Sequence, residues 1–182
     1  MPKEFLADRL DVGAFARADG LLSGEMQLSD FSRLLSECAG QAEGRRVSWR
    51  AQGSLPSSSG AQAQAWIHLQ IRVSLPLICQ RCLSPVDVDL SVDRNFRFVS
   101  SERQAELEDD QAEEDVLVLS TRFDLQALVE DELLMALPLV PRHEVCPIPV
   151  KLVTQDDDFD QAQEARPRPF DVLADFKNGK TE

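Results

Sequence analysis

Two long stretches of alternating apolar and polar residues dominate the chain, and a short cysteine-containing link joins them. Apolar side chains fall at every second position over residues 65–77, and the alternation resumes over residues 86–98. Successive side chains of a strand point to opposite faces of a sheet, so each stretch predicts a half-buried strand. Two such strands with a short connection predict a long antiparallel hairpin, with Cys79 and Cys82 at its tip.

Shorter patterns precede and follow this hairpin. Alternation predicts further strands over residues 20–28, 45–52 and 116–119. Helical spacing of apolar residues predicts a short helix over residues 11–18. It predicts another over residues 31–38, which Ser29 or Asp30 would cap and which would bury Cys38 as a small apolar side chain.

The longest predicted helix covers residues 125–137, where Asp124 is placed to cap it and Pro138 to end it. Its expected apolar face consists of Leu125, Leu128, Val129, Met135 and Ala136, and Leu133, Leu134 and Leu137 widen it at the C-terminal end. We expect this helix to pack on the hairpin sheet. The fold class is therefore α+β, a mainly antiparallel sheet around the long hairpin, packed by one long helix and several short ones in a single domain over residues 1–150.

Polar and acidic segments interrupt these patterns. Residues 102–115 hold eight carboxylates against one arginine, which predicts a solvated, flexible acidic loop at about residues 100–115. Residues 55–60 are predicted to form an exposed loop. Residues 151–182 form an acidic linker followed by a short amphipathic helix after Pro169, which would fold back onto the domain or dock on a partner.

The composition narrows the functional classes. The 182 residues carry a net charge of −13, which disfavours broad wrapping of a nucleic-acid backbone and favours a basic partner. The sequence contains no signal peptide and no apolar run of about 20 residues, so we expect a cytoplasmic protein that does not enter a membrane. In that reducing compartment its four cysteines predict thiols or metal ligands rather than disulfides.

Two pairs of ligand-type residues stand out. Cys79 and Cys82 have the spacing of a zinc knuckle, and His143 and Cys146 supply a second pair about 60 residues further on. Together they would form a closed, structural zinc site that ties the hairpin tip to the segment after the long helix. Two alternatives stay open, namely unmetallated thiols and a redox pair. A strand follows Cys82 where a thioredoxin-like motif would have a helix, which disfavours redox chemistry.

No catalytic residue is predicted. The chain has no phosphate-binding glycine loop, no dinucleotide fingerprint and no nucleophile elbow. Of its two histidines, His68 lies within a predicted strand, as a structural sheet residue rather than a base. We therefore expect a protein without enzymatic activity.

Two motifs in this order carry a family resemblance. Cys-Gln-Arg-Cys-Leu-Ser-Pro at residues 79–85, followed by the helix and Leu-Pro segment of residues 124–143, resembles the YceD family of large ribosomal RNA subunit accumulation proteins. The resemblance extends over residues 20–177 and includes the acidic segment. It implies a role in the synthesis, processing or stability of 23S ribosomal RNA, and it implies no catalytic activity. Many members have a fuller second cysteine pair, which here is reduced to His143 and Cys146.

The resemblance and the negative charge together suggest a ribosome-biogenesis factor that binds a basic large-subunit ribosomal protein or a pre-ribosomal particle. The carboxylates expected to attract that partner are Glu108, Asp109, Asp110, Glu113, Glu114 and Asp115. One alternative is a module that binds RNA directly through an arginine patch, formed by Arg45, Arg46, Arg50, Arg72 and Arg81. A thiol redox protein is the other alternative.

Overall fold

A computed structural model describes residues 5–40, 42–56, 63–149 and 159. The chain divides into two units, residues 1–147 and 148–182, and every strand and helix named below belongs to the first. The predicted loop at 55–60 lies mostly outside the described residues. So do the acidic linker, apart from Phe159, and the C-terminal helix.

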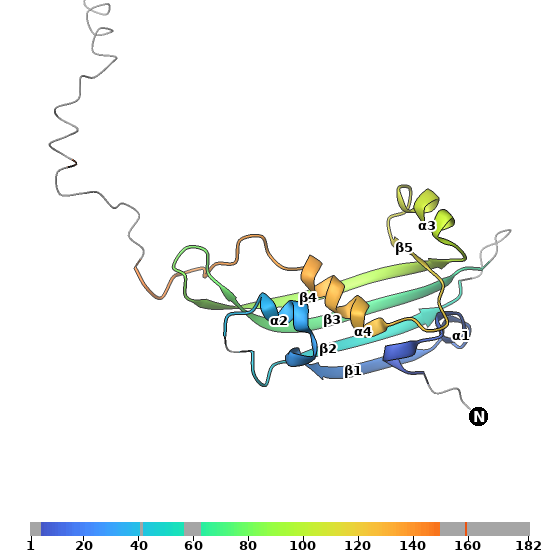
Figure 1. The fold of residues 1–182 in the computed structure, drawn as a ribbon, viewed down its shortest axis with the longest axis horizontal. Helices are drawn as coiled ribbons and strands as arrows, with labels where there is room; N and C mark the ends of the chain where they lie inside the picture. The colour runs from blue at the N-terminus through green and yellow to red at the C-terminus, as the bar shows by residue number, and fades with distance from the viewer. Residues whose placement is uncertain (1–4, 41, 57–62, 150–158, 160–182) are drawn as a thin grey trace, which may run out of the picture. The chain divides into compact units, whose positions relative to one another are not determined.

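Five strands form one sheet in the order β1-β2-β3-β4-β5 (Figure 1). Neighbouring strands are antiparallel from β1 to β4, whereas β5 runs parallel to β4. The strands are β1 (Leu21–Gln27), β2 (Arg46–Ser54), β3 (Ala65–Ile78), β4 (Pro85–Val99) and β5 (Asp115–Val118). The predicted α+β class with a mainly antiparallel sheet is confirmed.

The long hairpin consists of β3 and β4, which pair along their whole length. Ala65 lies opposite Phe98 at one end, and Ile78 lies opposite Pro85 at the other. This register leaves residues 79–84 as the connection at the tip, as the alternating pattern predicts.

Helices cover one face of the sheet (Figure 1). They are α1 (Val12–Arg17), α2 (Ser32–Ser36) and α4 (Leu125–Met135), with 3₁₀ turns η1 (Ala7–Arg9) and η2 (Leu28–Asp30) before α1 and α2. The core lies between these helices and the sheet, where the side chains of Ile67, Leu69 and Leu75 on β3 have no exposed surface. Complete burial of one such side chain contributes roughly 1.5–3 kcal/mol.

The buried face of α4 differs from the predicted one. Leu125, Leu128, Val129 and Leu133 are buried as expected, but Met135 is 79% exposed. The helix ends at Met135, so the apolar stripe follows the i, i+3, i+4, i+7, i+8 spacing from Leu125 and runs out at Leu133. Glu132 occupies the i+7 position and is only 7% exposed.

The short helix α2 also begins differently from the prediction. It starts at Ser32 with Phe31 in the N-cap position, and neither Ser29 nor Asp30 caps it. Asp30 instead accepts a hydrogen bond from the backbone N–H of Gln27 within the η2 turn. The helix needs no cap from its own flank because the carboxylate of Glu130 on α4 accepts the backbone N–H groups of Arg33 and Leu34.

The acidic segment is not the irregular loop that its composition predicts. Residues Glu102–Asp109 form helix α3, and Asp115 already belongs to β5. Ser101 caps α3 by accepting a hydrogen bond from the backbone N–H of Gln104, and Ala105 packs against Val99 and Val116 in a small second core. Local capping and this apolar contact outweigh the repulsion between the carboxylates.

No helix among the described residues is long and apolar enough to cross a membrane.

Candidate metal centre

The tip of the β3–β4 hairpin is a tight loop closed by its own backbone. The N–H of Cys79 donates to the carbonyl of Ser84 at 3.0 Å, and the N–H of Leu83 donates to the carbonyl of Cys79 at 2.8 Å. Leu83 has a φ of 60°, in the left-handed region that side chains seldom adopt. The loop turns both cysteines towards the same side.

The segment that follows α4 crosses to this tip, as the orange trace shows in Figure 1. The N–H of Gln80 donates to the carbonyl of Pro141 at 2.8 Å, which fixes the segment beside the loop. Pro138 lies just beyond the end of α4 and disfavours continuation of the helix, and the chain then runs without regular secondary structure to the hairpin.

Four ligand-type side chains meet where these two segments touch. One donor atom from each of Cys79, Cys82, His143 and Cys146 lies within 4.8 Å of all the others. The Sγ atoms of Cys79 and Cys146 are 3.9 Å apart, and the Sγ of Cys82 is 3.4 Å from Nδ1 of His143. The two predicted pairs therefore come together, and the cluster could hold a metal ion.

The donor set fits zinc. Three thiols and one imidazole match the tetrahedral coordination typical of structural zinc, and they leave no open position for a substrate. Cys79 is fully buried, and the other three side chains are partly buried. Such shielding is typical of a structural rather than a catalytic site.

The loop backbone favours the thiolate form of one cysteine. Burial raises the pKa of Cys79, but hydrogen bonds from the backbone N–H groups of Cys82, His143 and Arg81 lower it to about 5. Burial instead raises the pKa of Cys146, although Arg81 opposes that shift. A thiolate at neutral pH suits metal binding. A redox role also needs access to the sulfur, and Cys79 has no exposed surface.

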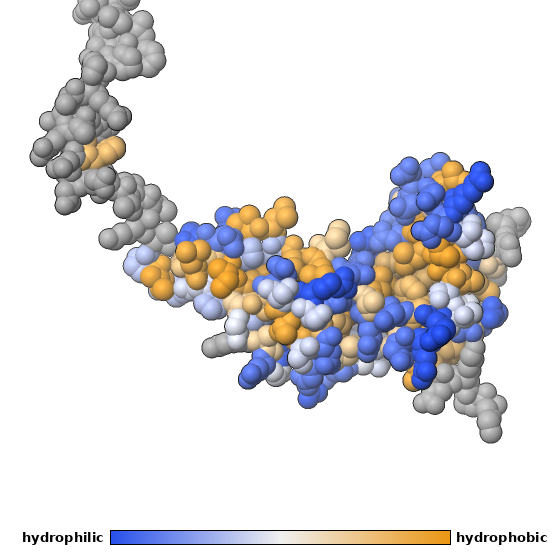
Figure 2. All heavy atoms as spheres, in the orientation of Figure 1, coloured by the Kyte–Doolittle hydropathy of each residue, from blue (hydrophilic) through white to orange (hydrophobic). Residues whose placement is uncertain are grey.

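Apolar side chains lie exposed around this cluster. Leu83 in the hairpin tip is 73% exposed, Leu139 is 99% exposed and Val145 is 86% exposed. Figure 2 shows hydrophobic surface at this end of the domain.

The five arginines of the predicted RNA-binding patch do not form one cluster. Arg46, Arg50 and Arg72 lie on the sheet face opposite the core, at exposed positions of β2 and β3. Arg45 pairs with Asp87 at 2.5 Å, and Arg81 lies at the metal centre.

Most of the carboxylates predicted to bind a partner have partners within the protein. Arg97 of β4 contacts both Glu108 and Glu114, its Nε lying 2.5 Å from Oε1 of Glu114. Asp115 pairs with Arg94 at 2.7 Å, and Asp109 accepts a hydrogen bond from the backbone N–H of Val116. Asp110 and Glu113 are exposed, as are Glu102 and Glu106 earlier in the segment.

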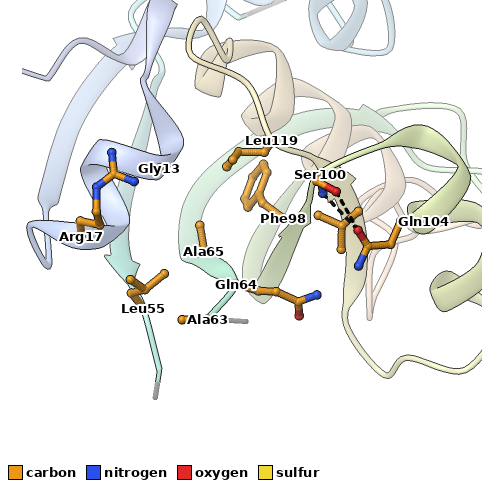
Figure 3. A pocket seen from close by; sticks show the side chains of 11 residues that line it. Gly13, Arg17, Leu55, Ala63, Gln64, Ala65, Phe98, Ser100, Gln104 and Leu119 are labelled. Carbon is orange, nitrogen blue, oxygen red and sulfur yellow. Dashed lines mark hydrogen bonds between the residues drawn. The ribbon is translucent and has the colours of Figure 1, made fainter. Parts of the chain in front are cut away.

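A pocket lies near the end of the hairpin opposite the metal centre (Figure 3). It encloses about 160 Å³, and its described lining contains no histidine, cysteine or carboxylate. The amide oxygen of Gln104, on its wall, already accepts hydrogen bonds from Ser100. His68 lies elsewhere, on the exposed sheet face, with Nε2 2.6 Å from Asp93.

Two functional contacts were not predicted from the sequence. Arg81 was named only as part of the alternative RNA-binding patch, and Arg97 was not expected to bind the acidic segment. A signal existed for the first, because Arg81 lies between two predicted ligands. For the second, only the strand register, which places Arg97 opposite Val116, could have suggested that Arg97 neighbours the segment.

The fold and the site define the class of protein, an α+β domain that could hold a structural metal ion. Its Cys₃His cluster lies between the hairpin tip and the segment after the last helix. Comparison with known proteins gives the family. The profile of large ribosomal RNA subunit accumulation protein YceD matches residues 67–177, more than half of the chain, so the chain belongs to the YceD family.

One curated relative is the large ribosomal RNA subunit accumulation protein YceD of Haemophilus influenzae. It is 34% identical over 116 residues, which cover 59% of this chain and 63% of the relative. The chain thus spans less than two thirds of that relative's length. No solved structure matches the chain.

Proposed function

We propose that this protein is a non-enzymatic ribosome-biogenesis factor that binds a basic ribosomal protein. It thereby supports the synthesis, processing or stability of 23S ribosomal RNA and the assembly of the large subunit. Membership of the YceD family is the observation that carries the proposal. The net charge of −13 supports a basic partner, because such a chain repels RNA phosphates and attracts positively charged proteins.

The ion pairs of the acidic segment bear on which of its carboxylates would attract this partner. Carboxylates bound to Arg97 and Arg94 hold α3 and β5 in place and have part of their charge neutralised. The attraction would then come from exposed carboxylates of the segment that lie outside these contacts, namely Glu102, Glu106, Asp110 and Glu113. Exposed apolar side chains near the metal centre offer a second contact, since such patches commonly mark interaction sites.

A binding experiment with charge variants tests this surface. One variant carries Gln or Asn at Glu102, Glu106, Asp110 and Glu113, and a control carries the same four charge changes at Asp8, Asp19, Glu37 and Asp89. We expect complexes with purified basic large-subunit proteins to weaken with salt and to be lost in the first variant but not in the control. Equal binding by both variants would remove the acidic segment from the proposal.

The Cys₃His cluster is proposed to bind zinc as a structural ion. The ion would be held by Cys79, Cys82, His143 and Cys146, joining the hairpin tip to the segment after α4. Its chemistry there would be purely structural, since four protein ligands complete a tetrahedron.

Direct RNA binding is the second candidate. The observation that favours it is the position of Arg46, Arg50 and Arg72 on one sheet face that no described helix covers. Arg46 pairs with Glu25 at 2.9 Å, which leaves Arg50 and Arg72 as the principal cations. If the double variant Arg50→Gln and Arg72→Gln lost precursor RNA while the acidic variant kept its protein partners, this candidate would replace the first.

A further inference from the structure

Arg81 lies between two ligand cysteines of the hairpin tip and contacts the other half of the metal centre. Its Nε donates to the Sγ of Cys146 at 3.0 Å. Its Nη2 donates to the carbonyl oxygens of His143 at 2.9 Å and Glu144 at 3.2 Å. One side chain thus binds three groups within a four-residue segment that is more than 60 residues away in sequence.

We propose that Arg81 is a positioning residue of the metal centre, which docks the His143–Cys146 segment against the hairpin tip and balances the charge of the thiolates. The inference rests on the proposed zinc function of the site. It concerns a residue that was named from the sequence only in the alternative RNA-binding patch.

Charge is the first part of the argument. A zinc ion with three thiolates and a neutral imidazole leaves one excess negative charge in a partly buried place. The guanidinium of Arg81 is always protonated and donates directly to one of these sulfurs, so the assembly becomes neutral. A thiolate that accepts such a hydrogen bond is also a weaker electron donor to the metal.

Geometry is the second part. A guanidinium presents several N–H groups in a rigid planar fork, so Nε and Nη2 reach the sulfur and the two carbonyls at once. A lysine ammonium would keep the charge but offers a single donor atom on a flexible stem. Loss of the fork should therefore loosen the second pair of ligands even where the charge is retained.

The test measures metal binding by the full-length chain. Zn²⁺ affinity is determined by competition with a chromophoric chelator, and Co²⁺ is used as a spectroscopic probe, in wild type, Arg81→Gln and Arg81→Lys. Arg50→Gln is the matched control, because Arg50 is an exposed arginine of the same sheet away from the cluster. Far-UV circular dichroism of each apo-protein checks that the fold is kept.

We expect Arg81→Gln to bind Zn²⁺ about 10–100-fold more weakly than wild type, the usual effect of removing a group that orients a metal ligand. The Zn²⁺ affinity of Arg81→Lys should lie between those of wild type and Arg81→Gln. The sulfur-to-cobalt charge-transfer bands should move to lower energy in Arg81→Gln, because the sulfur of Cys146 loses its hydrogen bond. Loss of stability alone would not move these bands.

Wild-type affinity and an unchanged cobalt spectrum in Arg81→Gln would overturn the role of Arg81 while leaving the zinc site intact. Failure of the wild-type chain to bind Zn²⁺ or Co²⁺ would overturn the zinc site and this inference with it. The two failures are distinguished by the wild-type titration.

Discussion

The carboxylate of Glu130 on α4 binds Arg33 on α2 through both its backbone and its side chain, across 97 residues of sequence. Oε1 accepts the backbone N–H of Arg33 at 2.8 Å and that of Leu34 at 3.2 Å, while Oε2 accepts Nε and Nη2 of the same arginine. These N–H groups belong to the first turn of α2, whose N-cap residue, Phe31, has no side-chain acceptor. Glu130 therefore caps α2 from a neighbouring helix.

Replacement of Glu130 should destabilise the domain clearly. Glu130→Ala leaves two backbone donors of α2 and a guanidinium without their acceptor, for a loss of about 2 kcal/mol in the free energy of unfolding. Asp131→Ala is the control, because Asp131 binds the same arginine at 2.6 Å but is half exposed. Asp131→Ala should lower the free energy of unfolding by less than about 1 kcal/mol. Urea denaturation measures both, and equal losses would contradict the capping role.

The two glutamates of α4 should respond to pH in opposite directions. Burial raises the pKa of Glu130, but hydrogen bonds from Leu34 and Arg33 outweigh it and leave the pKa below its ordinary value. Its stabilising effect is thus present above the ordinary glutamate pKa and disappears as the pH falls through the lowered value. Burial raises the pKa of Glu132 despite the nearby Arg94, so this carboxyl weakens the fold progressively as the pH rises from the ordinary glutamate pKa to the raised one, and fully above it.

We therefore expect Glu132→Gln to raise the melting temperature at pH 7 and to have little effect near pH 4, where Glu132 is largely protonated in both states. Glu130→Gln should lower the melting temperature at pH 7, and the difference from the wild-type melting temperature should become smaller in acid. Thermal melts of both variants from pH 4 to pH 8 measure these trends. A loss of stability at pH 7 in Glu132→Gln would show that its contact with Arg94 outweighs burial.

These contacts show where sequence patterns stop being informative. The hairpin was predictable because alternation is a local consequence of strand geometry, and the register follows from two arms of similar length. The acidic segment was predicted wrongly as a loop because, beside its local cap and the contact of Ala105, its order involves Arg97, which lies on a neighbouring strand and pairs with Glu108 and Glu114. Likewise, no local pattern reveals that Glu130 caps α2.

Close packing around Phe15 gives a further prediction. Gly53 on β2 approaches this ring so closely that an added Cβ would lie 2.6 Å from Cδ1 and 3.0 Å from the carbonyl carbon of Phe15. Gly53→Ala should therefore lower the free energy of unfolding by about 1–3 kcal/mol through overpacking. At Gly13, within α1, an added Cβ would lie 3.3 Å from the flexible end of Arg17 and 3.8 Å from Oδ1 of Asp11, so Gly13→Ala should be neutral or slightly stabilising. Chemical denaturation compares the two, and equal effects would contradict the close approach.

The metal centre was predictable in its members but not in its environment. The spacing of Cys79 with Cys82 and of His143 with Cys146 was enough to group the four side chains, because each pair is local in sequence. The interaction that joins the two pairs could not be predicted, because it combines a backbone hydrogen bond from Gln80 with the contacts of Arg81. Such contacts depend on how the segment after α4 crosses the tip.

Metal removal gives the last prediction. Wild-type protein purified without chelators should contain one zinc ion per chain, and treatment with a strong chelator should lower its melting temperature, because the ion joins two segments distant in sequence. Cys82→Ser removes one ligand and should abolish stoichiometric zinc as well as the effect of the chelator. Cys38→Ser is the matched control, because Cys38 is also a free, partly buried thiol but lies outside the cluster and donates to the carbonyl of Leu34. Cys38→Ser should retain both the stoichiometric zinc and the effect of the chelator. Elemental analysis with thermal melts measures these outcomes, and zinc-free wild type with a melting temperature that the chelator leaves unchanged would show that the cluster is held by its hydrogen bonds alone.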